Sequence, residues 1–346
     1  MSFKTLDPQD FLVSADSITA PAWSNYTPEL TTMFTSSTQE VGTSGQYFLN
    51  IYNKITSDST TEVQFNIAYG NKFGSGSTPY NTAYVNLSPT RTVYGQFRNL
   101  IYGDENTDFT FGDVVTTQQH FYALTIDRAR YKQSLFPGSL NLTLYSSSFE
   151  LNLTDNSAIT TTISYCDAGR IYQIVSGSDG YPYSGTGYTA NSGSYGFFLP
   201  DIGTIILNAS ALDLSYANGG INLGTGLTTS ANNPSKLFRT GSRGLIDTST
   251  SPSASSFFLN SQETITSDFV FCRARNGEFN YSENPSFISG STGAVLYDLF
   301  INNPTTYITT VGMYNDQNEL LAVAKLSKPL KKDFTKEALI RVKLDF

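Results

Sequence analysis

Histidine and cysteine are almost missing from this chain of 346 residues, which contains one His and two Cys. We therefore expect neither a histidine-based catalytic triad nor a multi-histidine zinc site. The single histidine, His120, directly precedes an apolar run, so we expect it to be hydrogen-bonded at a strand edge rather than to act as a base. Cys166 and Cys272 lie far apart in the sequence, and we expect free thiols rather than a disulfide.

The common catalytic and phosphate-binding motifs are also missing. Neither GxSxG nor GxxxxGK[ST] occurs, which excludes a nucleophile elbow and a P-loop. The acidic stretch Asp104–Asp108 lacks the glycine and the bidentate acid of a calcium loop, so we expect a solvated turn. We therefore expect no enzyme, no catalytic residue, no cofactor and no metal.

Charge is scarce, since Asp, Glu, Lys and Arg together make up 14% of the residues and the net charge is −8. A nucleic-acid partner needs clustered positive charge, so none is expected. No apolar run approaches the roughly 20 residues of a membrane helix, so we expect no membrane span. The first eight residues lack an apolar signal region, and we expect the protein to be made and assembled in a cytoplasm.

Aromatic residues are abundant, with 22 Tyr and 24 Phe but only one Trp. Ser, Thr, Asn and Gly supply the polar character, and strands and turns favour this composition more than helices do. We predict a mainly β protein with antiparallel, β-sandwich-like domains. We also predict a few short helices, long Gly/Ser-rich loops and an extended N-terminal arm.

The C-terminal residues carry the clearest pattern. Tyr307–Tyr314 and Glu319–Leu326 are strand-like runs that flank the polar tetrad Asn315–Asn318, which predicts a hairpin. In the closing run, apolar residues alternate with charged ones: Ile340, Val342, Leu344 and Phe346 against Arg341, Lys343 and Asp345. This period of two predicts a half-buried strand that ties down the end of the chain.

Composition divides the chain into four predicted segments. They are an extended N-terminal arm (1–45), a β-rich domain (46–165), a Gly/Ser/Tyr-rich, loop-rich insertion (166–265) and a C-terminal β module (266–346). The last module either stands alone or completes the sheet of 46–165. An arm without a periodic pattern folds only against something else, which suits contacts between subunits.

Local patterns predict individual elements within these segments. The predicted strands are 46–51, 62–69, 93–101, 109–111, 121–126, 140–145, 149–153, 196–199, 203–207 and 269–274. Short helices are predicted over 127–135 and around 209–217.

Aromatic and basic residues provide the candidates for an interface. They are Trp23, Tyr26 and Phe34 in the arm, Phe279, Tyr281 and Phe287 around an Asn-Pro turn, and Lys328, Lys331 and Lys332 with neighbouring Lys325. Two alternatives remain open for them. Phe279 and Tyr281 either anchor a partner or fill the core, and the lysines either blunt a strand edge or contact an acidic partner at a rim.

Long stretches resemble virion structural proteins of T4-like contractile-tailed phages, above all those of marine cyanobacteria. The stretches are FNIAYGNKFGSGS (Phe65–Ser77), VYGQFRNLIY (Val93–Tyr102), FYALTIDRARYKQSLFPGSLNLTL (Phe121–Leu144), FCRARNGEFNYSENPSF (Phe271–Phe287) and Ile301–Phe346. The resemblance implies a non-enzymatic tail or baseplate component, most specifically a baseplate wedge subunit. It also implies contacts with other tail proteins in a symmetric homo- or hetero-oligomer, and a place in the virion after assembly in the host cytoplasm.

Two other functions remain open. One is a receptor- or carbohydrate-binding fibre or spike module, with the Tyr-rich loop Tyr181–Tyr195 as a platform for sugars. The other is a polysaccharide-degrading enzyme, although nothing in the sequence singles out a pair of carboxylates.

Overall fold

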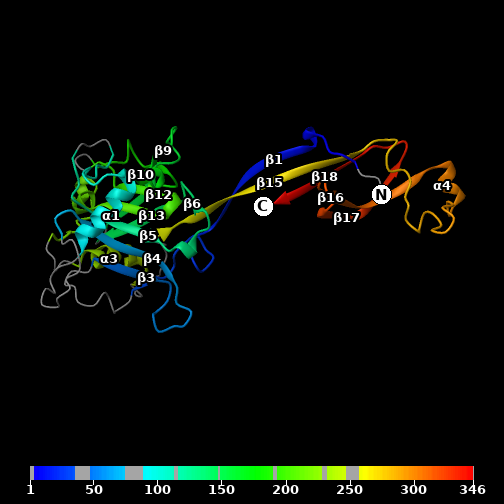
Figure 1. Cartoon of the computed structure of the whole chain (residues 1–346). Coiled ribbons are helices and arrows are strands. Elements are labelled where there is room, and N and C mark those ends of the chain that lie inside the picture. Colours follow the sequence, from blue (N-terminus) through cyan, green and yellow to red (C-terminus); the bar gives the residue numbers. More distant parts are fainter. Residues whose placement is uncertain are drawn as a thin grey trace. The chain divides into compact units, whose positions relative to one another are not determined.

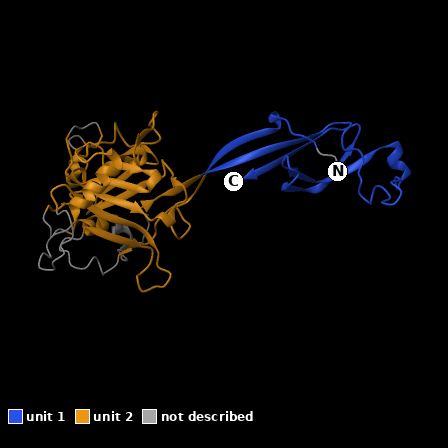
Figure 2. Cartoon of the chain, in the orientation of Figure 1, with its two compact units in different colours: residues 1–17, 264–346 blue, residues 18–263 orange. Residues whose placement is uncertain are grey.

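The computed structural model describes residues 4–35, 47–74, 89–112, 116–146, 149–189, 193–227, 232–246 and 257–345. The chain forms two compact units, which Figure 2 distinguishes by colour. Unit 1 comprises residues 1–17 and 264–346, and unit 2 comprises residues 18–263. The protein is mainly β, with antiparallel sheets and few helices, as the composition predicted.

One large sheet forms the body of unit 2 (Figure 1). Its strands follow the spatial order β14-β7-β8-β10-β12-β13-β5-β4-β3-β2, and the neighbours pair antiparallel. Their bounds are β2 Phe34–Thr35, β3 Phe48–Tyr52, β4 Val63–Asn71, β5 His120–Ile126, β7 Asn141–Ser146, β8 Phe149–Asp155, β10 Gly169–Ser178, β12 Gly196–Leu199, β13 Thr204–Asn208 and β14 Phe257–Phe258. Two short strands, β9 Ser164–Cys166 and β11 Tyr181–Pro182, pair with β10.

Strand β5 buries side chains on both faces of this sheet. Tyr122 and Leu124 point into the larger of two apolar clusters, and Phe121 and Ala123 point into the other. A strand with two buried faces reads as a continuous apolar run, which is why this strand was predicted correctly. The predicted hairpin over 140–145 and 149–153 is likewise confirmed as β7 and β8.

Helices cover parts of both faces. Helix α1 (Thr90–Tyr102) packs Tyr94, Phe97 and Ile101 into the smaller cluster, whereas α2 (Ala209–Asp213) and α3 (Asn233–Ile246) supply residues to the larger one. The prediction of a strand over 93–101 was wrong. The buried residues recur at intervals of three and four, which is the spacing of a helix face.

The prediction of a helix over 127–135 was also wrong. This stretch forms one 3₁₀ turn, Arg128–Arg130, and then the short strand β6, Ser134–Leu135. The Asp127 carboxylate accepts a hydrogen bond from the Ala129 amide, as a helix-starting residue would. The turn ends because Ser134 and Leu135 pair instead with Gln262 and Ser261 of β15.

Tertiary packing gives two other segments more structure than their composition indicated. The stretch 166–265, predicted to be rich in loops, provides β10, β12 and β13 in the middle of the large sheet. Parts of the predicted N-terminal arm between residues 11 and 33 pair with or pack against other segments of the chain. Residues Phe11–Pro21 form strand β1, and four residues that follow it are buried in unit 2: Ala22, Trp23, Leu30 and Met33.

Unit 1 contains long strands and loops. Strands β1, β15 (Asn260–Ala274) and β18 (Ala338–Asp345) form a sheet in the order β1-β15-β18. Strands β16 (Thr305–Tyr314) and β17 (Leu320–Asp333) form a sheet of their own, here called the ribbon. The β16–β18 strands therefore do not complete the sheet of unit 2. Helix α4 (Asp298–Asn302) lies in the loop that connects β15 to β16.

The predicted C-terminal hairpin is confirmed. The Asn315 amide donates to the Glu319 carbonyl at 3.1 Å, and Asn318 adopts a positive φ of 62°. Asn tolerates this left-handed conformation better than most residues, which explains the polar tetrad. The alternation in β18 is confirmed as well, since Ala338 and Val342 are buried while Arg341 and Lys343 are exposed; Phe346 lies outside the described residues.

Gly241 of α3 offers a test of the packing in unit 2. A Cβ atom added there would meet the Leu144 Cδ2 atom at 3.8 Å, an ordinary contact, and alanine is the better helix former. We expect Gly241→Ala to raise the free energy of unfolding by about 1 kcal/mol, measured by urea denaturation. As a control, Gly196→Ala should lower it by about 2–3 kcal/mol. Gly196 has a φ of 149°, and a Cβ there would collide with the Ile206 carbonyl oxygen. Stabilisation by both substitutions would contradict this description of the core.

Candidate protein-protein interface

The ribbon exposes many apolar side chains. Strand β17 is exposed or half-exposed from Leu320 to Lys331, and β16 is buried only at Thr305. An isolated two-stranded sheet is marginally stable in water, because neither face is covered. Much of the apolar surface of the ribbon is therefore uncovered within the described part of the chain.

One face of the ribbon is more exposed than the other. Gly312 lies opposite Val323, and Thr310 lies opposite Lys325, all on the exposed face. Leu321 follows the same alternation along β17 and is 68% exposed. The opposite face carries the pairs Val311–Ala324 and Met313–Ala322, which are half-buried.

The outer edge of β17 pairs with no strand of the described ranges. Lys325, Lys328 and Lys331 are exposed along this strand, and Pro329 removes one backbone donor. These features limit uncontrolled edge pairing and leave a positive rim. Lys331 lies 3.7 Å from Asp333, whose pKa is held below its ordinary value by hydrogen bonds from Thr335.

Lys332 is not part of this rim, which corrects its assignment as an interface residue. Its side chain is 0% exposed, and the ammonium group donates three hydrogen bonds. The acceptors are Asn276 O at 3.1 Å, Asn280 Oδ1 at 2.8 Å and Asp333 O at 3.0 Å. Because successive strand residues point to opposite faces, Lys332 is directed inward while Lys331 is directed outward.

These bonds make Lys332 an organiser of the turn Asn276–Asn280. The Asn280 amide group also donates to the Asn276 carbonyl, and Thr306 of β16 donates to the Phe279 carbonyl at 2.5 Å. Phe279 has a positive φ of 54°, a strained conformation for a bulky residue, and is half-buried. The turn leaves the next aromatic residue, Tyr281, exposed. Tyr281 thus remains an interface candidate.

The α4 region exposes a second apolar surface, here called the α4 patch. Phe287 is buried and stacks on Phe300, with ring centroids 4.7 Å apart and planes at 5°, so Phe287 supports the loop from within. Four neighbouring side chains face solvent: Leu296, Tyr297, Leu299 and Ile301. Phe287 is therefore no longer assigned to an interface.

The three candidates in the N-terminal segment have different environments within unit 2. Trp23 is 2% exposed, packs edge-on against Phe257 and donates its indole N–H to the Pro28 carbonyl, so it belongs to the core. Tyr26 is 89% exposed and has a φ of 59°, and Phe34 is partly exposed in β2. Tyr26 and Phe34 therefore remain candidates.

The sequence reasoning missed the α4 patch and the leucines of the ribbon. A signal for the ribbon was present, because consecutive Leu320 and Leu321 cannot both face a core from one strand. The sequence signal for the α4 patch was weaker, since the spacing of its apolar residues fits a buried helix face equally well.

The single histidine and the two cysteines, whose side chains are reactive in many enzymes, are all half-buried. His120 begins β5 beside Tyr69, and burial lowers its pKa. Cys166 and Cys272 are free, half-buried thiols, and burial raises the pKa of each. No group of three or more His, Cys, Asp or Glu among the described residues is arranged to hold a metal ion. None of the described helices is long and apolar enough to cross a membrane.

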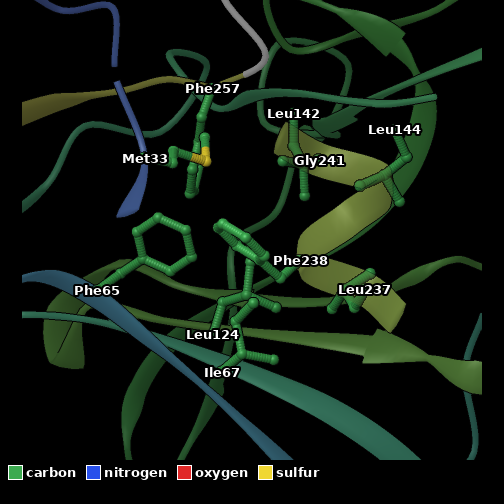
Figure 3. A pocket seen from close by; sticks show the side chains of 10 residues that line it. All are labelled: Met33, Phe65, Ile67, Leu124, Leu142, Leu144, Leu237, Phe238, Gly241 and Phe257. Atoms are coloured by element: carbon green, nitrogen blue, oxygen red, sulfur yellow. The ribbon is translucent and has the colours of Figure 1, made fainter. Parts of the chain in front are cut away.

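An apolar cavity in unit 2 is too small to bind a ligand (Figure 3). Its volume is about 20 Å³, and Met33, Phe65, Phe238 and Phe257 surround it together with aliphatic residues and Gly241 of α3. A space of this size holds one water at most, and its walls offer no polar partner. It is a small packing gap between the sheet and α3.

A scan against protein-family models finds no match for this chain. Searches of curated proteins and of solved structures find no match either.

Neighbouring lysines provide a matched test of the turn. Lys332→Met removes three hydrogen bonds from a side chain that is fully buried, so we expect unit 1 to lose about 2–3 kcal/mol of stability. Hydrogen exchange at the Asn276–Asn280 amides should accelerate accordingly. Lys331→Met, which removes a 3.7 Å ion pair between an exposed lysine and Asp333, should change stability by less than about 1 kcal/mol. Equal effects of the two substitutions would contradict the inward direction of Lys332.

Proposed function

We propose that this protein is a non-enzymatic structural subunit of a phage contractile tail, and specifically of the baseplate wedge. One observation carries the proposal: unit 1 has almost no apolar core but a large apolar surface. Its buried apolar residues among the described ranges are only Val270, Ala274, Phe287, Ala338 and Val342. Both large apolar clusters belong to unit 2.

The exposed apolar side chains of unit 1 are far more numerous. They are Phe11, Leu12, Val13, Tyr281, Leu296, Tyr297, Leu299, Ile301, Tyr307, Tyr314, Leu320, Leu321, Val323, Leu330, Phe334 and Leu339. Scattered apolar residues are ordinary on a protein surface, but groups of this size mark interaction sites. A unit with so little buried area gains the rest of its stability from partners.

The sequence resemblance to virion proteins of T4-like phages supports a tail or baseplate assembly in particular. Under this proposal, subunits assemble in the host cytoplasm and act in the virion through contacts with each other or with other tail proteins. The exposed face of the ribbon and the α4 patch provide apolar contacts. Lys325, Lys328 and Lys331 provide a positive rim that favours an acidic partner surface.

The ribbon can be tested by substitution in the full chain. We expect the double variant Leu321→Ser, Val323→Ser to weaken association with itself or with co-expressed tail proteins at least tenfold, about 1.4 kcal/mol, in light scattering or pull-down assays. Both side chains are exposed in the single chain, so unit 2 should unfold at an unchanged urea concentration. The control Ile55→Ser, an exposed residue of unit 2, should leave association unchanged.

The assignment to the virion has an independent test. Density for this chain at the baseplate in images of intact particles would support the proposal. A stable monomer that associates with no tail protein, and whose ribbon amides are protected from exchange in isolation, would refute it.

A further inference from the structure

A polar cleft lies on the outer face of the unit 2 sheet, over β14, β7, β8 and β10. Its volume is about 380 Å³, in the range of small-molecule sites. The register places Phe258 opposite Asn141 and Thr143 opposite Asn152, so all four share one face. The residue between them on β7, Leu142, points into the apolar core on the other side. The sheet thus provides a rigid floor for the cleft.

Hydrogen bonds fix the polar groups of this floor. The Asn141 amide donates to Asp179 Oδ1 at 2.7 Å, and the Asp179 backbone amide donates to Asn141 Oδ1 at 2.8 Å. Thr143 Oγ1 donates to Asn152 Oδ1 at 2.7 Å. Asp179 holds this position with a φ of 52°, at the turn between β10 and β11. The side chains are therefore oriented before any ligand arrives, which reduces the entropy lost on binding.

Two groups at the cleft retain hydrogen-bonding capacity. Within the described part of the chain, neither Asn152 Nδ2 nor the Glu29 carboxylate has a hydrogen-bond partner. One is a donor and the other an acceptor, and both line the same space. A ligand with hydroxyl groups can satisfy both, because each hydroxyl donates and accepts.

Aromatic rings complete the cleft. Tyr183, from the loop after β11, is 63% exposed, and Phe258 of β14 is half-buried. A pyranose ring has apolar C–H faces and polar edges, so it can rest on an aromatic ring while its hydroxyls reach the amides. Tyr195, by contrast, is buried and donates its hydroxyl to the Gly219 carbonyl, so it is not part of a sugar platform.

The charge of the cleft restricts the ligand further. Its lining includes the carboxylates of Glu29 and Asp179 but no Lys or Arg. Phosphorylated, sulfated and uronic-acid ligands would be repelled, and a nucleic acid would lack its usual counter-charges. We propose that this cleft binds a neutral saccharide. The proposal goes beyond a structural role and does not rest on it.

The test is calorimetric titration of the full chain with maltohexaose, cellohexaose, mannohexaose and chitohexaose, each to about 10 mM, a range that detects weak binding. We expect saturable binding of at least one. Polygalacturonate is the acidic arm and should not bind. Tyr183→Ala and Asn152→Ala should each weaken binding about tenfold, because one removes a stacking surface and the other a donor.

Tyr165→Ala is the matched control, since this tyrosine is also exposed but belongs to β9 and does not line the cleft. It should leave the affinity unchanged, and urea unfolding should confirm that all three variants are folded. Absence of binding by every neutral saccharide would overturn the proposal. Preferred binding of polygalacturonate, or equal affinity in the wild type and both cleft variants, would also overturn it.

Discussion

Burial of β5 on both faces is the constraint on which unit 2 depends. A strand with apolar side chains pointing both ways needs two covering layers, and the chain supplies them from distant segments. Helix α1 packs on the side of Phe121, while α2, α3 and the residues around Trp23 pack on the side of Tyr122. The neighbours β4 and β13 are held in register between these layers. This rigidity allows the outer face of β7 and β8 to present a preorganised row of polar groups.

In unit 1, by contrast, most large apolar side chains are left exposed. Its ribbon has apolar residues on both faces, as β5 does, yet only one face is even half-buried within the chain. At one end of the ribbon, the buried side chain is a lysine rather than an apolar residue. Lys332 of β17 donates hydrogen bonds to Asn276 and Asn280 in the turn that precedes Tyr281. Such bonds specify geometry more than they contribute net stability. Unit 1 is therefore ordered in detail but weakly stabilised by its own core, which is consistent with the proposed role in an assembly.

The two units explain where prediction from the sequence succeeded. Strands such as β5 and β18 were predictable because a period of two, or a continuous apolar run, records the burial of a strand directly. Helix α1 was mistaken for a strand because Val93, Tyr94 and Ile101 have β propensity, and only packing against the sheet selects the helical spacing. The candidates Trp23, Phe287 and Lys332 were misplaced for a related reason. Residue type indicates a capacity for contacts, but it does not tell whether the partner lies in the same chain.

The sequence by itself determined the mainly β class and the C-terminal hairpin, because composition and turn residues are local properties. Tertiary structure alone decided which apolar residues are covered. It buried Trp23 and left Leu321 exposed, although both are large, mainly apolar side chains. It also gathered Glu29, Asn152 and Tyr183 around one cleft from three separate segments. Proximity of this kind depends on strand order and register, which no local pattern encodes.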